Sequence, residues 1–339
     1  MIVGVAEFTS GAAIPARVIA EFSSGGRLGE PVRTRDGWLV AVHGSPELIE
    51  VDDALLERGR VRFDAGVEQW LGCAVAPDGA IAVAADAEVL LTEADGTVRH
   101  RWTHPAWQFH TGGSVSFDEA GRLWFAVPGE PAGQADTVRV VDPGTGGTVA
   151  SLPTPNDEGM FAIAQAGPGR TIAEVACGQD GAYGYLVTEG PAGFELTGLP
   201  DAGVAGVDAD TCFLFDLDGE WLARYGLVRH AELARIASGE LELPAWEWEG
   251  FGYQALPLDA DTVVATTLRG RLVLLDAGTL ELIGTIWPDG YDLTADEDDP
   301  TGDLTAIAVA PGGRLLIVRD QRRLQLLELA EEPIASSAT

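Results

Sequence analysis

Hydrophobic residues along the chain fall into short runs separated by turn residues, and the pattern returns about every 45 residues. One copy begins at Leu71 and reads LGCAVAPDGAIAVAADAEVLLTEADGTVRHRWTHP. Further copies begin at Gly113, Gly159, Gly252 and Leu304. Each has an apolar run, a tight turn, a second apolar run and a third run that ends in another turn. The pattern predicts a repeated β-strand unit, because a helical solenoid would show a 3.6-residue period instead.

The turn residues support strand reversals. Pro-Asp-Gly at Pro77–Gly79 and Pro-Gly-Gly at Pro311–Gly313 supply the fixed or positive φ angles that tight hairpins need. The runs VRVVD (Val138–Asp142) and LVLLD (Leu272–Asp276) are rich in β-branched and aliphatic residues at strand length. Each is followed by a turn that contains Gly-Thr and by a further strand-like run. Each repeat therefore contains four short strands.

Through VAPDG at Val75–Gly79, VAPGG at Val309–Gly313 and the phrases VRVVDPGTGGTV and LVLLDAGTLELI, the chain resembles the β-propeller superfamily of WD-repeat, YVTN-type and NHL-type proteins. The resemblance covers nearly the whole chain, although the Gly-His and Trp-Asp dipeptides of true WD repeats are absent. It implies an all-β, seven-bladed β-propeller of four-stranded antiparallel blades, and we expect residues 1–339 to be one domain. The expected blades are residues 27–63, 70–103, 113–153, 159–200, 203–248, 252–288 and 304–329.

The last and the fifth expected blades depart from the pattern. The last holds three strands, so we expect a spare N-terminal strand, Ile2–Phe8 or Arg17–Phe22, to close it and to remove an exposed sheet edge. In the fifth, Leu222, Tyr225, Val228, Leu233 and Ile236 lie at roughly helical spacings, which predicts a short inserted helix. Since the first and fifth segments are the least regular, six or eight blades stay open.

The amino-acid composition excludes several classes of partner and of chemistry. The net charge of −32 opposes affinity for nucleic acid and for anionic membranes, so neither is expected as a partner. All 21 basic residues are arginine, which excludes Schiff-base and phosphate-loop lysine chemistry. A hydrophobic content of 46% is enough for a sizeable globular core.

The cysteines and the N-terminus predict a cytoplasmic, soluble protein. Cys73, Cys177 and Cys212 are odd in number and far apart and form no CxxC pair, which favours buried thiols in a reducing compartment. The opening MIVGVAEFTSGAAIPAR has no basic residue before its short apolar stretch, and nothing later approaches 18 uninterrupted apolar residues.

The segments before the expected first strands are rich in acidic and aromatic residues. In a propeller the first strand of each blade lines a central channel, so these segments crowd around one mouth of that channel. They are Val67–Gly72, Trp107–Gly113, Pro155–Met160, Trp246–Gly252 and Asp296–Asp303. The ligand-binding residues expected there are Trp70, Trp107, Trp246, Trp248, Phe251 and Asp303. Aromatic rings beside carboxylates favour a cationic or polyhydroxylated ligand. The alternative is that these rings fill the wedge between neighbouring blades.

Two further clusters are candidates for chemistry. His110 with Glu158 and Glu249 could supply acid-base or metal-binding groups, whereas His100 and His104 are more typical of structural positions. The acidic run Asp289–Asp303 brings together Asp292, Asp296, Asp298 and Asp299, whose hard oxygen ligands suit Ca²⁺ or another divalent metal. It lacks the EF-hand spacing, and a solvated loop is the alternative.

The leading hypothesis is a non-catalytic binding or scaffold propeller that engages a protein partner or a cationic or small ligand at the acidic, aromatic mouth. The rival is a propeller enzyme, a metal-assisted hydrolase or lyase, that acts on a small molecule at the same mouth. No GxSxG motif supports a serine hydrolase, and no CxxCH supports covalent haem.

Overall fold

The computed structural model describes residues 12–68, 71–107, 114–130, 134–155, 160–176, 182–199, 203–208, 210–215, 221–227, 233–240, 251–267, 270–288 and 304–330. These residues form the strands β1 to β28 and contain no helix, which confirms the all-β class. They group into two compact units, Ser24–Gly203 with Val228–Glu232, and Met1–Ser23 with Val204–Leu227 and Leu233–Thr339. We call them the β2–β17 unit and the β18–β28 unit; β1 belongs to the second of these.

The β2–β17 unit contains four sheets, each of four antiparallel strands in chain order. The first is β2 (Arg27–Arg33), β3 (Gly37–His43), β4 (Glu47–Asp52) and β5 (Glu57–Arg62). The second is β6 (Gly72–Val75), β7 (Ile81–Ala84), β8 (Glu88–Thr92) and β9 (Val98–Thr103). The third is β10 (Val115–Phe117), β11 (Leu123–Val127), β12 (Thr137–Val141) and β13 (Thr148–Pro153). The fourth is β14 (Met160–Gln165), β15 (Arg170–Ala176), β16 (Ala182–Gly190) and β17 (Gly193–Gly198).

The β18–β28 unit contains three more groups of strands. A four-stranded sheet holds β18 (Gly203–Asp208), β19 (Thr211–Phe215), β20 (Trp221–Leu227) and β21 (Leu233–Glu240). An eight-stranded sheet joins β22 (Phe251–Pro257), β23 (Thr262–Thr267), β24 (Leu272–Asp276) and β25 (Leu282–Pro288) to β26 (Leu304–Ala310), β27 (Arg314–Arg319) and β28 (Arg323–Leu329) through β1 (Ala12–Ser23). The strands therefore fall into seven groups of four, which is the number of blades that we expected.

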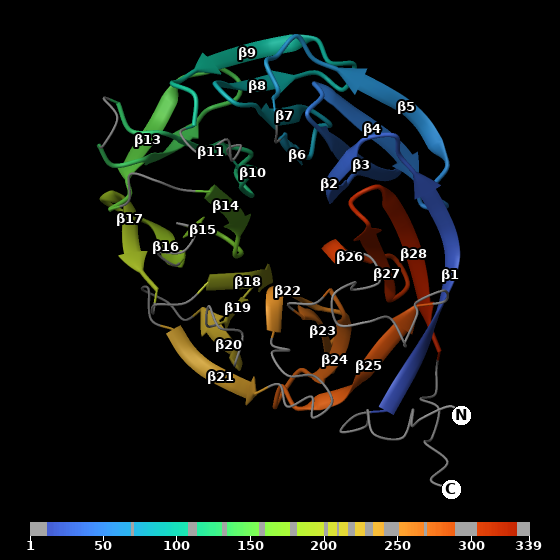
Figure 1. The fold of residues 1–339 in the computed structure, drawn as a ribbon. Helices are drawn as coiled ribbons and strands as arrows, with labels where there is room; N and C mark the ends of the chain where they lie inside the picture. The colour runs from blue at the N-terminus through green and yellow to red at the C-terminus, as the bar shows by residue number, and fades with distance from the viewer. Residues whose placement is uncertain are drawn as a thin grey trace, which may run out of the picture. The chain divides into compact units, whose positions relative to one another are not determined.

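The N-terminal strand completes the last blade, as expected. Residues Ala16–Ser23 of β1 pair antiparallel with β28. Its first residues, Ala12–Ala16, also pair in parallel with Gly284–Pro288 at the outer edge of β25. Figure 1 shows β1 as a long blue strand that runs along both β25 and β28. One strand thus joins two neighbouring blades, which the sequence did not predict.

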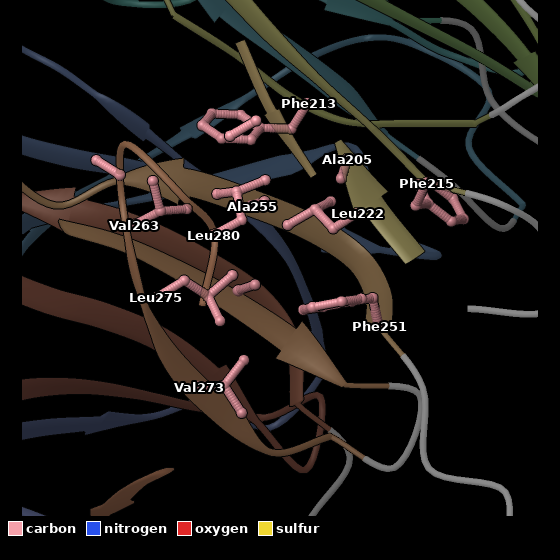
Figure 2. Packing of buried hydrophobic residues seen from close by; sticks show 13 residues of the cluster. Ala205, Phe213, Phe215, Leu222, Phe251, Ala255, Val263, Val273, Leu275 and Leu280 are labelled. Carbon is pink, nitrogen blue, oxygen red and sulfur yellow. The ribbon is translucent and has the colours of Figure 1, made fainter. Parts of the chain in front are cut away.

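Within each unit, the hydrophobic core lies between consecutive sheets. Second strands such as β11 and β19 are buried at every position, whereas the fourth strands β5, β9 and β13 alternate between exposed and half-buried residues. In the β18–β28 unit, Phe213 and Phe215 of β19 share a buried cluster with Phe251, Val263 and residues of β24 (Figure 2). Apolar burial of this kind provides most of the stabilisation in each unit.

Side chains also link neighbouring first strands. The backbone N–H of Ile163 in β14 donates to Ser114 Oγ, just before β10, at 3.0 Å. In the β18–β28 unit, the N–H of Ile307 in β26 donates to Gln254 Oε1 of β22 at 2.8 Å. Ser114 and Gln254 occupy equivalent positions. Ser114 precedes Val115, which pairs with Phe125 of β11, and Gln254 precedes Ala255, which pairs with Ala265 of β23. These hydrogen bonds hold the first strands of adjacent blades together.

The repeated Asp-x-Gly-Thr phrase forms one kind of turn between third and fourth strands. The N–H and Oγ1 of Thr145 donate to Asp142 Oδ1 at 2.7 and 3.0 Å, and those of Thr279 donate to Asp276 Oδ1 at 2.8 and 3.1 Å. These backbone hydrogen bonds favour the ionised carboxylates, so they lower the pKa of both aspartates. The phrase therefore supplies both the side-chain acceptor and the donors that close this turn.

The outer strand of each blade is the one that pairs with the blade's third strand on the side away from the second strand. Six of the seven outer strands that the structure describes carry a β-bulge at an equivalent position, where one residue of the outer strand has no partner in the third strand. The bulged residues are Ile19, Arg58, Arg99, Val149, Ile236 and Ile283. Val149, Ile236 and Ile283 are among the most exposed large hydrophobic residues that the structure describes. A bulge twists an open sheet edge and interrupts its hydrogen-bonding pattern, so it protects outer strands from pairing with other chains.

The helix expected in the fifth blade is wrong over the residues that the structure describes. Trp221–Leu227 is β20 and Leu233–Glu240 is β21, and the two pair with each other. β20 also pairs with β19, where Leu222 and Ala223 are fully buried. Sheet pairing on a buried surface outweighs the weak local preference for helix.

Candidate functional site

Two kinds of connection between strands lie on the same side of each sheet. Since consecutive strands run antiparallel, the turn from the second to the third strand and the connection from the fourth strand to the next sheet leave on the same side. We call the described connections on this side of the β2–β17 unit the loop face. They are residues 44–46, 63–68, 71, 85–87, 104–107, 114, 128–130, 134–136, 154 and 155. Of the expected mouth segments, the loop face includes residues 67, 68, 71, 107 and 155.

The turn at Asp86 holds two of these connections. The backbone N–H of Glu68, before β6, donates to Asp86 Oδ2. The N–H of Trp107 donates to the Asp86 carbonyl at 3.3 Å, and the N–H of His104 donates to the Ala87 carbonyl at 3.0 Å. Asp86 therefore fixes the segments that lead into both β6 and β10. Asp86 could not be recognised from the sequence, because a hydrogen bond to a backbone N–H leaves no pattern of residue types.

His43 has a similar role at the end of β3. The N–H of Leu71 donates to His43 Nδ1 at 3.4 Å, so this ring nitrogen must be unprotonated. Burial of the ring, with a smaller contribution from Arg27, lowers the pKa of His43 to about 4. His43 is thus neutral near pH 7 and supports the segment before β6.

His104 lies half-buried beside Trp107. Its Nδ1 lies 2.7 Å from the Pro105 carbonyl, and because a carbonyl only accepts, Nδ1 carries the proton. Burial lowers the pKa of His104, with Arg139 adding to this effect and the Pro105 carbonyl and Glu88 opposing it. The neutral ring then has an unprotonated Nε2. That nitrogen is able to accept a hydrogen bond, and the ring packs against Trp107.

Trp107 and Phe251 are core residues in this structure. Trp107 is 6% exposed, and its ring centroid lies 5.7 Å from that of Phe161 and 6.0 Å from that of His104. Phe251 is 1% exposed and belongs to the cluster of Figure 2. Their burial supports the alternative in which large rings fill the space between blades, and their part in ligand binding stays a prediction.

The remaining expected site residues lie outside the described residues. They are Trp70, Trp246, Trp248 and Asp303 of the aromatic mouth, His110, Glu158 and Glu249 of the acid-base set, and Asp292, Asp296, Asp298 and Asp299 of the metal set. Within the described ranges, no three His, Cys, Asp or Glu side chains gather closely enough to hold a metal ion.

The described cysteines are unreactive thiols. Cys212 is buried and Cys73 is half-buried, and both are free. Burial raises the pKa of each thiol to about 12, and Glu30 adds to this effect at Cys73. Neither thiol ionises near pH 7, so neither is a nucleophile there. Cys177 lies outside the described residues.

The connections of the loop face give a direct test of the role of Asp86. Asp86→Ala removes the acceptor of the Glu68 N–H, and we expect a loss of about 1 kcal/mol of stability. Amide hydrogen exchange over residues 63–68 should become faster. Asp95→Ala is the matched control, because Asp95 Oδ1 accepts the Thr97 N–H at 2.9 Å in a turn on the other side of the sheet. Unchanged exchange over residues 63–68 in Asp86→Ala would show that the carboxylate does not hold this connection.

No protein-family model matches the chain, and no curated protein matches it. Among the described residues, no helix is long and apolar enough to span a membrane.

Solved structures do match. The β-propeller domain of Cps50 (Swd1) from Myceliophteria thermophila has a TM-score of 0.64 at 11% identity, over 92% of this chain and 99% of that one. The computationally designed Ika8 protein has a TM-score of 0.58 at 11% identity, over 91% and 98%. The WD40 β-propeller domain of Doa1 has a TM-score of 0.57 at 12% identity, over 94% and 97%. At these identities the similarity shows the fold: the chain is a seven-bladed β-propeller with its N-terminal strand in the last blade.

Proposed function

We propose that this protein is a non-catalytic binding or scaffold propeller, which engages a protein partner or a cationic or small ligand on its loop face. The observation that carries the proposal is the fixed geometry of that face. Asp86 and His43 hold the connections before β6 and β10 through side-chain and backbone hydrogen bonds. Loops on a rigid scaffold are typical of binding surfaces.

Charge favours a cationic partner. The net charge is −32, and Glu68 is exposed on the loop face beside the Asp86 turn. The arginines that the structure describes on β5 and β9 are neutralised within their own sheets, as in Arg60–Glu47 and Arg101–Glu88. An acidic surface attracts basic segments and repels nucleic acid.

Charge reversal at Glu68 tests this proposal. We expect Glu68→Arg to weaken binding of a short oligoarginine peptide several-fold at physiological ionic strength, measured by calorimetric titration. Glu119→Arg makes the same charge change in the turn between β10 and β11, on the opposite side of the sheet, and should have little effect. Equal weakening by both variants would mean that the peptide senses only the net charge.

Two further proposals concern the chain as a whole. We propose that residues 1–339 are a single propeller domain, which is supported by solved propeller domains that match more than nine-tenths of the chain. We also propose a cytoplasmic location, for which free thiols at Cys73 and Cys212 are the support.

A further inference from the structure

The outer strand β17 differs from the other six that the structure describes, because it has no β-bulge. Its register with β16 runs without a shift from the pair Tyr185–Gly198 to the pair Gly190–Gly193. The turn between the two strands is short, with only Pro191 and Ala192 between the paired glycines. β17 is therefore a straight edge strand, which is the kind of edge that readily pairs with another strand.

The hydrogen-bonding groups on the open side of β17 follow from its register. The N–H of Leu199 donates to the Gly184 carbonyl at 2.8 Å, so these two residues form a hydrogen-bonded pair. In an antiparallel ladder such pairs alternate, and the next ones are Leu186–Thr197 and Thr188–Glu195. The intervening residues Phe194, Leu196 and Gly198 consequently direct their N–H and C=O groups to the open edge.

The side chains of β17 give this edge two different faces. Phe194 and Leu196 are half-buried and pack against the buried cluster between the third and fourth sheets. Phe194 also meets Trp124 edge-on at 5.2 Å and lies under the Arg122 guanidinium. Glu195, on the opposite face, is exposed. Side chains of an added strand would alternate between the two faces of the sheet. Those on one face would lie beside Phe194 and Leu196, and those on the other face would lie beside Glu195.

The molecule already contains one example of strand addition at an outer edge. Beyond the bulge at Ile283, residues Gly284–Pro288 of β25 form a regular stretch, and this stretch pairs with Ala12–Ala16 of β1. An outer edge of this fold thus accepts an added strand where no bulge interrupts it.

We propose that the open edge of β17 binds an extended peptide segment of a partner protein by strand addition, with alternating apolar and basic residues. The apolar residues would lie beside Phe194 and Leu196, and a basic residue would pair with Glu195. Backbone hydrogen bonds to an exposed edge provide affinity in this mode, and alternate side chains provide specificity. A second copy of this chain suits the edge less well. It would place a second Glu195 near the first, and the two chains, each with a net charge of −32, would repel each other.

A proline at Gly198 tests the proposal with little change to the fold. Gly198→Pro removes one of the outward N–H groups, and Gly198→Ala is the matched control, since a Cβ at this position meets no atom within 4 Å. The probe is a short, fluorescently labelled peptide of alternating valine and lysine, added to the full chain. Anisotropy should show saturable binding that Gly198→Pro weakens about tenfold and Gly198→Ala leaves unchanged. Equal binding to wild type and Gly198→Pro would overturn the proposal.

Hydrogen exchange locates the bound peptide independently of affinity. At saturating peptide, amides over residues 193–199 should exchange more slowly, and residues 63–68 of the loop face should be unaffected. Slowing on the loop face without slowing at β17 would overturn this inference and support the proposed function instead. Light scattering of the protein without peptide tests whether a second copy of this chain binds the edge instead. A dimer that Gly198→Pro abolishes would assign the edge to a second copy and would also overturn the inference.

Discussion

Ala16→Asp should lower the melting temperature by roughly 6 °C or more. Ala16 is fully buried at the point where β1 passes from β25 to β28, and it pairs with both Pro288 and Leu329. A carboxylate there has no partner, and burying it costs at least about 4 kcal/mol. With an unfolding entropy of roughly 0.7 kcal per mol per kelvin for a chain of 339 residues, that loss gives the expected shift. Differential scanning calorimetry measures it.

Arg17→Ala is the control in the same strand. Arg17 is exposed and forms a surface ion pair with Glu328 at 2.5 Å, so its removal should change the melting temperature by about 1 °C at most. Deletion of residues 1–22 should have a larger effect than Ala16→Asp, since it opens the edges of both β25 and β28. A deletion variant that melts like wild type would disprove the role of β1 in holding the last blade.

The same calorimetric scans test the single-domain proposal. If the whole chain unfolds cooperatively, wild type gives one transition and Ala16→Asp shifts all of it. Two transitions, of which Ala16→Asp shifts only one, would mean that the two compact units unfold independently and that the chain is not one domain.

Turn chemistry made the blades predictable from the sequence. Pro-Asp-Gly at Pro77–Gly79 and the Asp-x-Gly-Thr phrases at Asp142 and Asp276 each need particular backbone angles or a side-chain acceptor, so they mark strand reversals wherever they occur. The unit that they mark recurs about every 45 residues, which predicted four-stranded blades. The fifth blade was harder because apolar residues in adjacent strands can imitate a helical period when the turn between them is not obvious.

The candidate site was less predictable because it depends on long-range hydrogen bonds. Asp86 accepts from the Glu68 N–H and His43 from the Leu71 N–H, across 18 and 28 residues of sequence. A backbone donor is present at nearly every residue, so no residue type identifies the partner. The tryptophans were visible in the sequence, but burial distinguishes packing from binding, and burial at Trp107 is set by the neighbouring sheet.

Asp118 can be recognised as an exception in the sequence, and it belongs to a partly buried charge network. It takes the place of Ala76, Ala166 and Ala310 at the end of the first strand of other blades. Asp118 is 7% exposed and accepts hydrogen bonds from Arg122 Nε at 2.6 Å and from Trp124 Nε1 at 2.9 Å. Arg122 also binds both carboxylate oxygens of Glu189, at 2.9 and 2.7 Å. The network ties the third and fourth blades together.

Arg122→Ala should therefore destabilise the protein by about 3 kcal/mol, because it leaves the buried carboxylate of Asp118 without its cationic partner. With the unfolding entropy used above, the melting temperature should fall by roughly 4 °C. Arg122→Lys keeps the charge but not the paired N–H groups, so its loss should be smaller. Arg99→Ala removes a more exposed arginine from surface ion pairs with Glu93 and Asp78 and should change the melting temperature far less.

The loss of stability in Arg122→Ala should depend on pH, and this dependence identifies the part of the loss that comes from the ion pair with Glu189. Hydrogen bonds from Arg122 lower the pKa of Glu189 below its ordinary value of 4.5. A lowered pKa in the folded state adds stability above the pKa of the unfolded state, and that stability is lost as the pH falls through the folded pKa. The difference in melting temperature between wild type and Arg122→Ala should thus be largest near pH 7 and become smaller below about pH 4. A difference that stays constant from pH 7 to pH 3 would mean that Arg122 acts through packing on Phe194 and not through its charge.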